Sequence, residues 1–288
     1  MDFSLERILA VIGAGVTLVF VVAMLVLLPK IRRYLPAFLQ YRPLLFSLVS
    51  RDLKVKYRRS TLGLLWSVLQ PLFIMLIVSA VFSNILRVGV ENYPAFYITG
   101  VLIFGFVSDA TNHSLNSIGS ASSLLKKVYI PRYIFPLEKC AFAFVNMLFS
   151  LIAVALVYLV LRTPLHPTIL LFPIPMLYTA IFSFGLSLVL SAAVVFFKDV
   201  AHLYAIWITA WMYLTPILYP LEIIPGVMQT ILRFNPLLYY VEYIRDVMLY
   251  GVVPGLGMNL ICLGFALSTL AVGLLVFKRT QDRFILHV

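Results

Sequence analysis

A run of positive charge is the first place where this sequence offers chemistry. Residues 51–60 read RDLKVKYRRS and hold five basic side chains in ten positions. Guanidinium and ammonium groups form charge-assisted hydrogen bonds with phosphate and carboxylate oxygens. The residues that follow, TLGLLWSVLQPL, are almost entirely apolar. This juxtaposition predicts a basic segment on the membrane surface that runs directly into a membrane helix.

A second set of polar side chains lies inside an apolar stretch. Residues 108–117 read SDATNHSLNS, and four polar side chains recur there at helical spacing, which places them on one face. Two interpretations are open. The face is either the wet end of a spanning helix packed on its neighbours, or the wall of a polar pathway at the inner mouth. The four residues are Asp109, Asn112, His113 and Asn116.

Motifs for enzyme chemistry are absent from the sequence. It contains no G-x-x-x-x-G-K-[ST] loop for ATP, no H-E-x-x-H zinc motif and no G-x-S-x-G nucleophile motif. Its two cysteines, Cys140 and Cys262, lie in apolar runs and are predicted to pack as small apolar side chains. We therefore expect no catalytic residue, no metal and no cofactor in this chain.

The elements that must hold these residues are predicted to be membrane helices. Of the 288 residues, 62% are hydrophobic and 11% are charged, and the mean hydropathy is +1.04. A soluble domain is about 45–50% apolar and about 25% charged. Long apolar runs, rather than alternating ten-residue segments, indicate an all-α integral membrane protein. The net charge of +11 is confined to short loops, which argues against nucleic-acid binding.

Seven apolar runs are predicted to span the membrane. Of the 22 lysines and arginines, 17 lie in alternate loops, so the positive-inside rule predicts an outside N-terminus and a cytoplasmic C-terminus. The first run is predicted to be a retained span, because the preceding MDFSLER has the wrong charge for a signal peptide. The runs are 8–28, 61–83, 95–118, 137–161, 168–196, 200–219 and 258–277.

Two further stretches are predicted not to span. Residues 42–60 form an amphipathic helix that lies in the headgroup plane. Residues 220–251 are apolar but broken by prolines and charges, which favours two short helices that dip back into the outer side. On the amphipathic helix, Phe46, Val49, Leu53 and Tyr57 share the apolar face, and Ser47, Arg51, Lys54 and Arg58 share the wet one.

Aromatic side chains gather in the third and sixth runs and in the broken stretch. They are interpreted either as an interfacial belt or as a lining on which sugar rings stack. The candidates for a channel lining are Tyr93, Tyr97, Phe104, Trp207, Trp211, Tyr213, Tyr239 and Tyr240.

Four segments in order resemble the permease subunits of ABC-2-type exporters, the family that exports O-antigen, capsule and teichoic acid. The first segment is the basic helix, which runs into a membrane helix that contains Trp and Gln-Pro. The others are similar to the family's two cytoplasmic loops and its outer re-entrant pair, although the second loop has Lys-Asp where Arg-Asp is commoner. The segments are RDLKVKYRRSTLGLLWSVLQPL (51–72), SSLLKKVYIPRYIFPLEK (122–139), FFKDV (196–200) and LEIIPGVMQTILRFNPLLYYVEYIRDVML (221–249).

The resemblance implies a fold of six core helices, here with one extra N-terminal helix, in a bacterial inner membrane. It divides the chain into an extra span (1–29), a linker with the amphipathic interface helix (30–60) and the transmembrane domain (61–288). It also implies a homodimer that works with two copies of a separate ATP-binding subunit, which binds the ATP and Mg²⁺. The cargo it implies is a lipid-linked glycan moved outward.

The resemblance also assigns roles to the basic segments. Arg58 and Arg59 are candidates for binding a lipid pyrophosphate; the alternative is that they only hold the helix to anionic lipid. The residues expected to dock on the ATPase are Arg51, Asp52, Lys54, Lys56, Tyr57, Lys126, Lys127, Tyr129, Pro131 and Arg132.

Two other functions compete with glycan export. One is an ABC-2 permease for another lipid or a drug, although large outer domains or fused ATPases, common in such permeases, are absent here. The other is an ATP-independent flippase or membrane enzyme for lipid-linked sugars. That function requires catalytic carboxylates or a polar central cavity, for which only Asp109 is a candidate.

Overall fold

The computed structural model describes residues 40–58, 62–85, 89–128 and 130–284. The predicted span at 8–28 lies outside these residues. The described part is helical and contains no strand, which confirms the all-α prediction. In lipid a backbone must satisfy its own hydrogen bonds, and an apolar helix does so within one segment.

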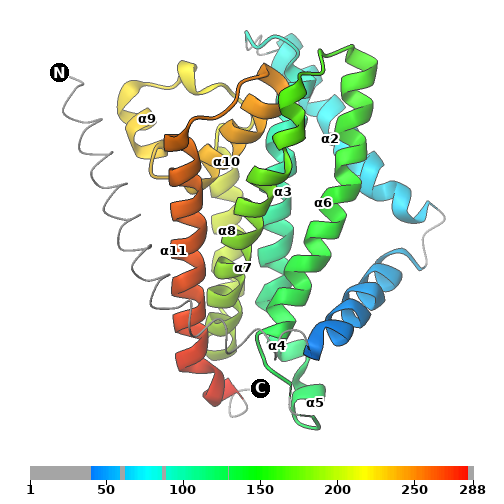
Figure 1. The fold of residues 1–288 in the computed structure, drawn as a ribbon, viewed down its shortest axis with the longest axis vertical. Coiled ribbons are helices and arrows are strands. Elements are labelled where there is room, and N and C mark those ends of the chain that lie inside the picture. Colours follow the sequence, from blue (N-terminus) through cyan, green and yellow to red (C-terminus); the bar gives the residue numbers. More distant parts are fainter. Residues whose placement is uncertain (1–39, 59–61, 86–88, 129, 285–288) are drawn as a thin grey trace.

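Five described helices are long and apolar enough to cross a membrane. In Figure 1 the first of them slants away from the others, which run roughly parallel. The first joins a short turn, a helix with an internal Pro71 and a π-helical end. The candidate spans are Gly63–Ser83, which contains α2 (Trp66–Ser79); α3 (Tyr93–Leu115); α6 (Ile134–Leu161); Pro167–Phe196, which contains α7 (Pro173–Phe196); and Leu256–Arg283, which contains α11 (Leu256–Thr280).

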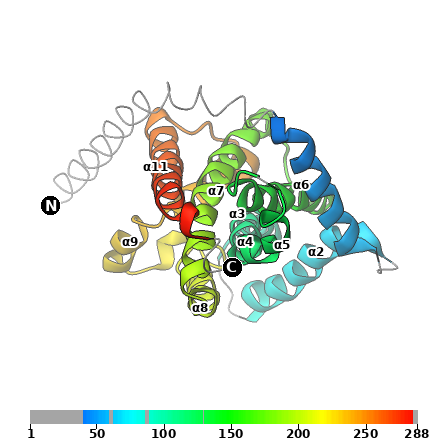
Figure 2. The same ribbon diagram turned by 90° about the horizontal axis from the view of Figure 1, so that it is seen from below.

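Helix α3 is the centre of the molecule. It packs against α2, α6, α7, α8 (Val200–Tyr213) and α10 (Pro236–Arg245), and Figure 2 shows it enclosed when the structure is seen from below. Two short helices, α4 (Ser117–Ser120) and α5 (Ser122–Leu125), follow it at the lower end in Figure 1. The central helix therefore leads directly into the segment that precedes α6.

Helices α7 and α11 approach each other at backbone distance. A Cβ atom on Gly273 would lie 2.3 Å from the carbonyl oxygen of Gly185, and one on Gly185 would lie 2.5 Å from the nitrogen of Leu270. Small residues allow such close packing between membrane helices. The two glycines therefore set the distance between these helices.

The predicted sixth span is shorter in the structure than in the sequence analysis. Helix α8 comprises Val200–Tyr213, 14 residues or about 21 Å of helix. It ends before Pro216, which has no amide hydrogen and restricts the residue before it. Just beyond the end of the helix, the Leu214 carbonyl oxygen and Thr215 Oγ1 accept hydrogen bonds from the side-chain amide of Asn235, at 3.0 and 2.9 Å.

The broken stretch forms short helices, as predicted. These are a 3-10 turn (Leu221–Ile223), α9 (Gly226–Leu232), α10 (Pro236–Arg245) and a π-helical turn (Asp246–Tyr250). They lie at the upper end in Figure 1. Asn235 caps α10 by accepting a hydrogen bond from the Leu237 amide, and it also accepts one from the Trp211 indole.

Candidate functional site

The interface helix, residues 40–57, lies obliquely across the lower end of the bundle (Figure 1). Leu48 of this helix packs with Ile130, Ile134 and Phe135, which flank the start of α6. The predicted wet face is exposed as expected. Phe46, predicted on the apolar face, is also 60% exposed, because the face that meets the protein is centred on Leu48.

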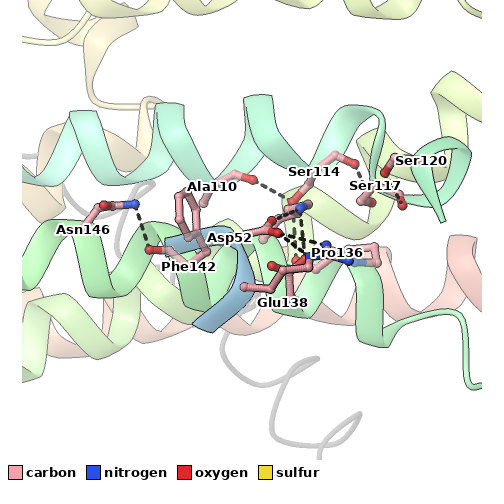
Figure 3. Close-up of polar contacts among 11 residues, drawn as sticks. Asp52, Ala110, Ser114, Ser117, Ser120, Pro136, Glu138, Phe142 and Asn146 are labelled. Atoms are coloured by element: carbon pink, nitrogen blue, oxygen red, sulfur yellow. Dashed lines mark hydrogen bonds and ion pairs between the residues drawn. The ribbon is translucent and has the colours of Figure 1, made fainter. Parts of the chain in front are cut away.

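An ion cluster attaches this helix to α6. Lys139 Nζ pairs with Asp52 Oδ2 and lies 3.1 Å from Glu138 Oε2, and Arg51 Nη2 lies 2.9 Å from Asp52 Oδ1. Figure 3 shows Asp52 and Glu138 converging from the two helices. Burial by itself raises the pKa of Asp52, but hydrogen bonds from Lys139 and Arg51 outweigh it and hold the pKa below its usual range.

A second polar contact lies one turn further along the same helix. Lys56 Nζ donates to Asn146 Oδ1 at 3.2 Å, and the Tyr57 hydroxyl donates to the same oxygen at 2.9 Å and also contacts Ser67. The Lys56 ammonium lies 5.6 Å from the centre of the Phe142 ring. These contacts tie the end of the interface helix to α2 and α6.

A cavity of about 420 Å³ lies between α2, α3 and α6, with Met212 of α8 at its border. Most of its wall is apolar. Lys56 and Asp109 are its charged lining residues, and no ion pair within 4 Å joins them in the described part of the chain. The other polar lining side chains are Ser67, Gln70, Tyr97, Asn146 and Ser150.

The polar face predicted on residues 108–117 is exposed in the structure. Asp109, Asn112, His113 and Asn116 all lie on the outside of this single chain. Asn112 donates to Ser108 Oγ at 3.2 Å, and the His113 ring meets Phe142 edge-on. By contrast, Ser114 and Ser117 on the opposite side donate to carbonyl oxygens of their own segment (Figure 3).

Several of the residues expected to dock on an ATPase already have contacts within the chain. The side chains of Arg51, Asp52, Lys56 and Tyr57 contact other side chains, and Arg132 Nη1 donates to the Gln281 carbonyl oxygen. Pro131 is half-buried, while Tyr129 and the pyrophosphate candidate Arg59 lie outside the described residues. Among the docking candidates, the exposed basic residues are Arg51, Lys54, Lys56, Lys126 and Lys127, and the pyrophosphate candidate Arg58 is exposed as well.

The aromatic candidates are divided between the core and the surface. Those that are buried hold helices together: for example, the Tyr93 hydroxyl donates to the Leu218 carbonyl oxygen at 2.7 Å, and Tyr240 donates to Cys262 at 3.0 Å. Trp207 and Tyr213 are 52% and 57% exposed on α8. The buried ones are Tyr93, Tyr97, Phe104, Trp211 and Tyr240, and Tyr239 is intermediate.

Arg245 was not identified from the sequence as a site residue. Its side chain is buried and donates to the carbonyl oxygens of Phe96, Pro216 and Ile217 at 2.7 to 3.3 Å. Its guanidinium also stacks 3.5 Å from the centre of the Phe96 ring. Burial lowers the pKa of Arg245 to about 10, so it stays charged at neutral pH. A single arginine in a short, mostly apolar helix was the available signal.

Comparison with known proteins agrees with this architecture. Residues 43–249 match the family model for ABC-2 type transporters. An O-antigen export system permease protein RfbA of Klebsiella pneumoniae is 30% identical over 242 residues, which is 84% of this chain and 93% of its own. Another, from Myxococcus xanthus, is 33% identical over 69% of this chain and 77% of its own. The polysialic acid transport protein KpsM of Escherichia coli is 25% identical over 82% and 93%. With the family model covering most of a helical membrane bundle, this chain belongs to the ABC-2 type transporter family.

Proposed function

We propose that this protein is the permease subunit of an ATP-driven exporter that moves a lipid-linked cell-surface polysaccharide outward across a bacterial inner membrane. The observation that carries the proposal is the similarity to O-antigen permeases, which extends over 84% of this chain. The substrate class comes from those relatives, and the structure supplies a cavity and a polar helix face of suitable chemistry.

The lower end in Figure 1 is proposed to face the cytoplasm and to meet the ATPase. Exposed lysines and arginines gather there, on the interface helix and at Lys126 and Lys127. The positive-inside rule places such charge in the cytoplasm. We further propose that two copies of a separate ATP-binding subunit serve a homodimer of this chain, which itself carries no cofactor.

The glycan is proposed to pass along the face between α2 and α8. Asp109 and Asn112 are exposed on α3 at that face, and Trp207 and Tyr213 are exposed on α8. Carboxylate and amide groups bind sugar hydroxyls, and aromatic faces suit sugar C–H groups. The basic end of the interface helix, at Arg58 and Arg59, is proposed to receive the phosphate of the lipid carrier.

Purification of the tagged protein from its native membrane in mild detergent tests the proposal. An ATPase with a phosphate-binding loop should accompany it in about equal amount. Reconstituted vesicles that contain both subunits should move the lipid-linked glycan only when ATP is present. A partner variant that binds ATP without hydrolysing it provides the control. Robust glycan movement by the permease alone would contradict ATP-driven export and favour an ATP-independent flippase.

The same vesicles test the cargo. A drug or an ordinary phospholipid should not stimulate ATP hydrolysis, whereas the lipid-linked glycan should. Stimulation by the drug or phospholipid alone would contradict the proposed substrate class and leave the ATP-driven permease in place.

A further inference from the structure

The C-terminal turn, residues 281–284, lies against the segment that joins α3 to α6. This turn is outside the part of the chain that matches the family model, which ends at residue 249. Residues 280–284 read TQDRF, and four of these five side chains are polar or charged. A turn of this composition is ordinarily solvated.

Phe284 is nevertheless 1% exposed. Its ring lies 5.3 Å from that of Phe277 and 5.9 Å from that of Phe196. It belongs to one buried cluster with Ile118 of α4 and Leu188 of α7, and Leu125 of α5 packs against the same cluster. One aromatic side chain therefore joins the C-terminal end to three other parts of the lower end.

A polar contact reinforces this packing. Arg132 donates through Nη1 to the Gln281 carbonyl oxygen, and the same nitrogen lies 3.6 Å from Asp282 Oδ1. The Asp282 side chain is 88% exposed, so the ion pair contributes little. The Arg132 side chain is 18% exposed, and its bond to the carbonyl sets where the turn sits.

Leu125 lies where two clusters meet. It packs on the Phe284 cluster on one side and on the cluster of Leu48, Ile130, Ile134 and Phe135 on the other. The second cluster holds the interface helix. We therefore expect a displacement of Phe284 to change the packing of Leu125 and, through the second cluster, the packing of the interface helix.

We propose that the C-terminal turn is a brace that holds the segment 117–133 in the position from which it meets the partner ATPase, with Phe284 as the positioning residue. The brace itself is independent of any partner. Its consequence for docking rests on the proposed function.

Cysteine labelling of the full-length protein tests the brace directly. Both native cysteines, Cys140 and Cys262, are buried, so they leave a low background. A Leu125→Cys reporter is half-buried, and its labelling by a water-soluble maleimide reports local opening. Phe284→Ala should raise the labelling rate roughly tenfold or more, whereas Phe284→Leu, which keeps most of the apolar volume, should stay near the unaltered rate.

Two controls separate the brace from general unfolding. Arg283→Ala alters an exposed neighbour in the same turn and should leave the Leu125→Cys rate unchanged. A Ser123→Cys reporter is already exposed and should label equally in all variants. If Phe284→Ala fails to accumulate in the membrane, Phe284→Val is compared in the same way. Equal labelling of Leu125→Cys in the Phe284 and Arg283 variants would overturn the brace.

The docking consequence is measured as the amount of ATPase that co-purifies with each permease variant. Phe284→Ala should lower it roughly tenfold, and Phe284→Leu should restore it. Faster labelling with undiminished co-purification would overturn the docking role. If no ATPase accompanies even the unaltered chain, the proposed function fails, and the labelling experiment alone decides the brace.

Discussion

At the scale of residues, a half-buried lysine and a buried arginine are held in different ways. Lys139 is paired with two carboxylates, Asp52 and Glu138, whereas Arg245 is surrounded by backbone carbonyl oxygens. A buried charge is stable only if its surroundings replace the water it has lost. Both cations therefore fix the position of the backbone or side chains around them, at opposite ends of the molecule.

Replacement of Arg245 by methionine should destabilise the protein by about 3 kcal/mol. The change removes the hydrogen-bond donor that the buried carbonyl oxygens of Phe96, Pro216 and Ile217 share, and an unsatisfied buried acceptor is destabilising. Thermal unfolding in detergent measures the loss. Arg233→Met is the matched control, because that side chain is exposed in the neighbouring loop. Equal melting temperatures for the two variants would show that the Arg245 contacts contribute nothing to stability.

Asp109→Leu should lower ATP-dependent glycan export roughly tenfold while the amount of assembled complex stays unchanged. The reason is the loss of a charged hydrogen-bond acceptor at the cavity, which is worth about 1.5–3 kcal/mol in contact with a hydroxyl. Glu91→Leu, at an exposed site outside the cavity lining, should export normally. Unimpaired export by the Asp109 variant would remove this residue from the glycan path.

At the scale of elements, the interface helix is attached by an apolar cluster, by an ion cluster and by the polar contacts of Lys56 and Tyr57. The apolar cluster contains Leu48, and the ion cluster contains Asp52. Because these residues are four apart, they lie one above the other on the same face of the helix. The exposed Arg51 and Lys54 side chains are thereby presented away from the bundle.

Asp52→Asn should loosen the interface helix and speed its amide hydrogen exchange, while Lys54→Ala, at an exposed position, should not. The attachment also predicts a pH dependence. The folded-state pKa of Asp52 is below the ordinary 3.8, so its contribution is complete above about pH 3.8 and is lost as the pH falls through the lower folded value. Exchange should therefore be insensitive to this group between pH 5 and 8. A loosening near pH 6 that Asp52→Asn abolishes would contradict the assignment.

At the scale of the whole molecule, one side of this chain is unsuited to lipid. Asp109 and Asn112 are exposed on α3, which packs against both α2 and α8. Ionisable groups inside a membrane usually face protein or a water-filled space. The two neighbouring helices also carry exposed apolar side chains, among them Ile77 on α2 and Ile206 on α8. We expect a second copy of the chain to cover this face and to enclose the polar strip.

A chain that carries both Ile77→Cys and Ile206→Cys should form a cross-linked dimer with a short bis-maleimide. In a two-fold arrangement, α2 of one copy meets α8 of the other. Val160→Cys paired with Leu275→Cys provides the control, since these exposed positions lie on α6 and α11 rather than on α2 and α8. A dimer from the control pair alone would place the contact between copies elsewhere.

The sequence by itself determined the membrane class, the amphipathic character of residues 42–60 and the short helices of 220–251. Such features depend on composition, on helical periodicity and on proline, which act locally. It also identified the polar face at Asp109, because side chains at spacings of three and four share a face in any helix.

The tertiary structure decided which partners these residues have. That Lys139 meets Asp52, that Arg245 meets Phe96 and that Phe284 is buried all depend on contacts between distant segments, for which a helical pattern carries no signal. Helix α8 ends at Tyr213, and the Leu214 carbonyl oxygen just beyond it accepts a hydrogen bond from Asn235, more than twenty positions away in the sequence. Periodicity shows which face of a helix is apolar, and only packing decides what that face meets.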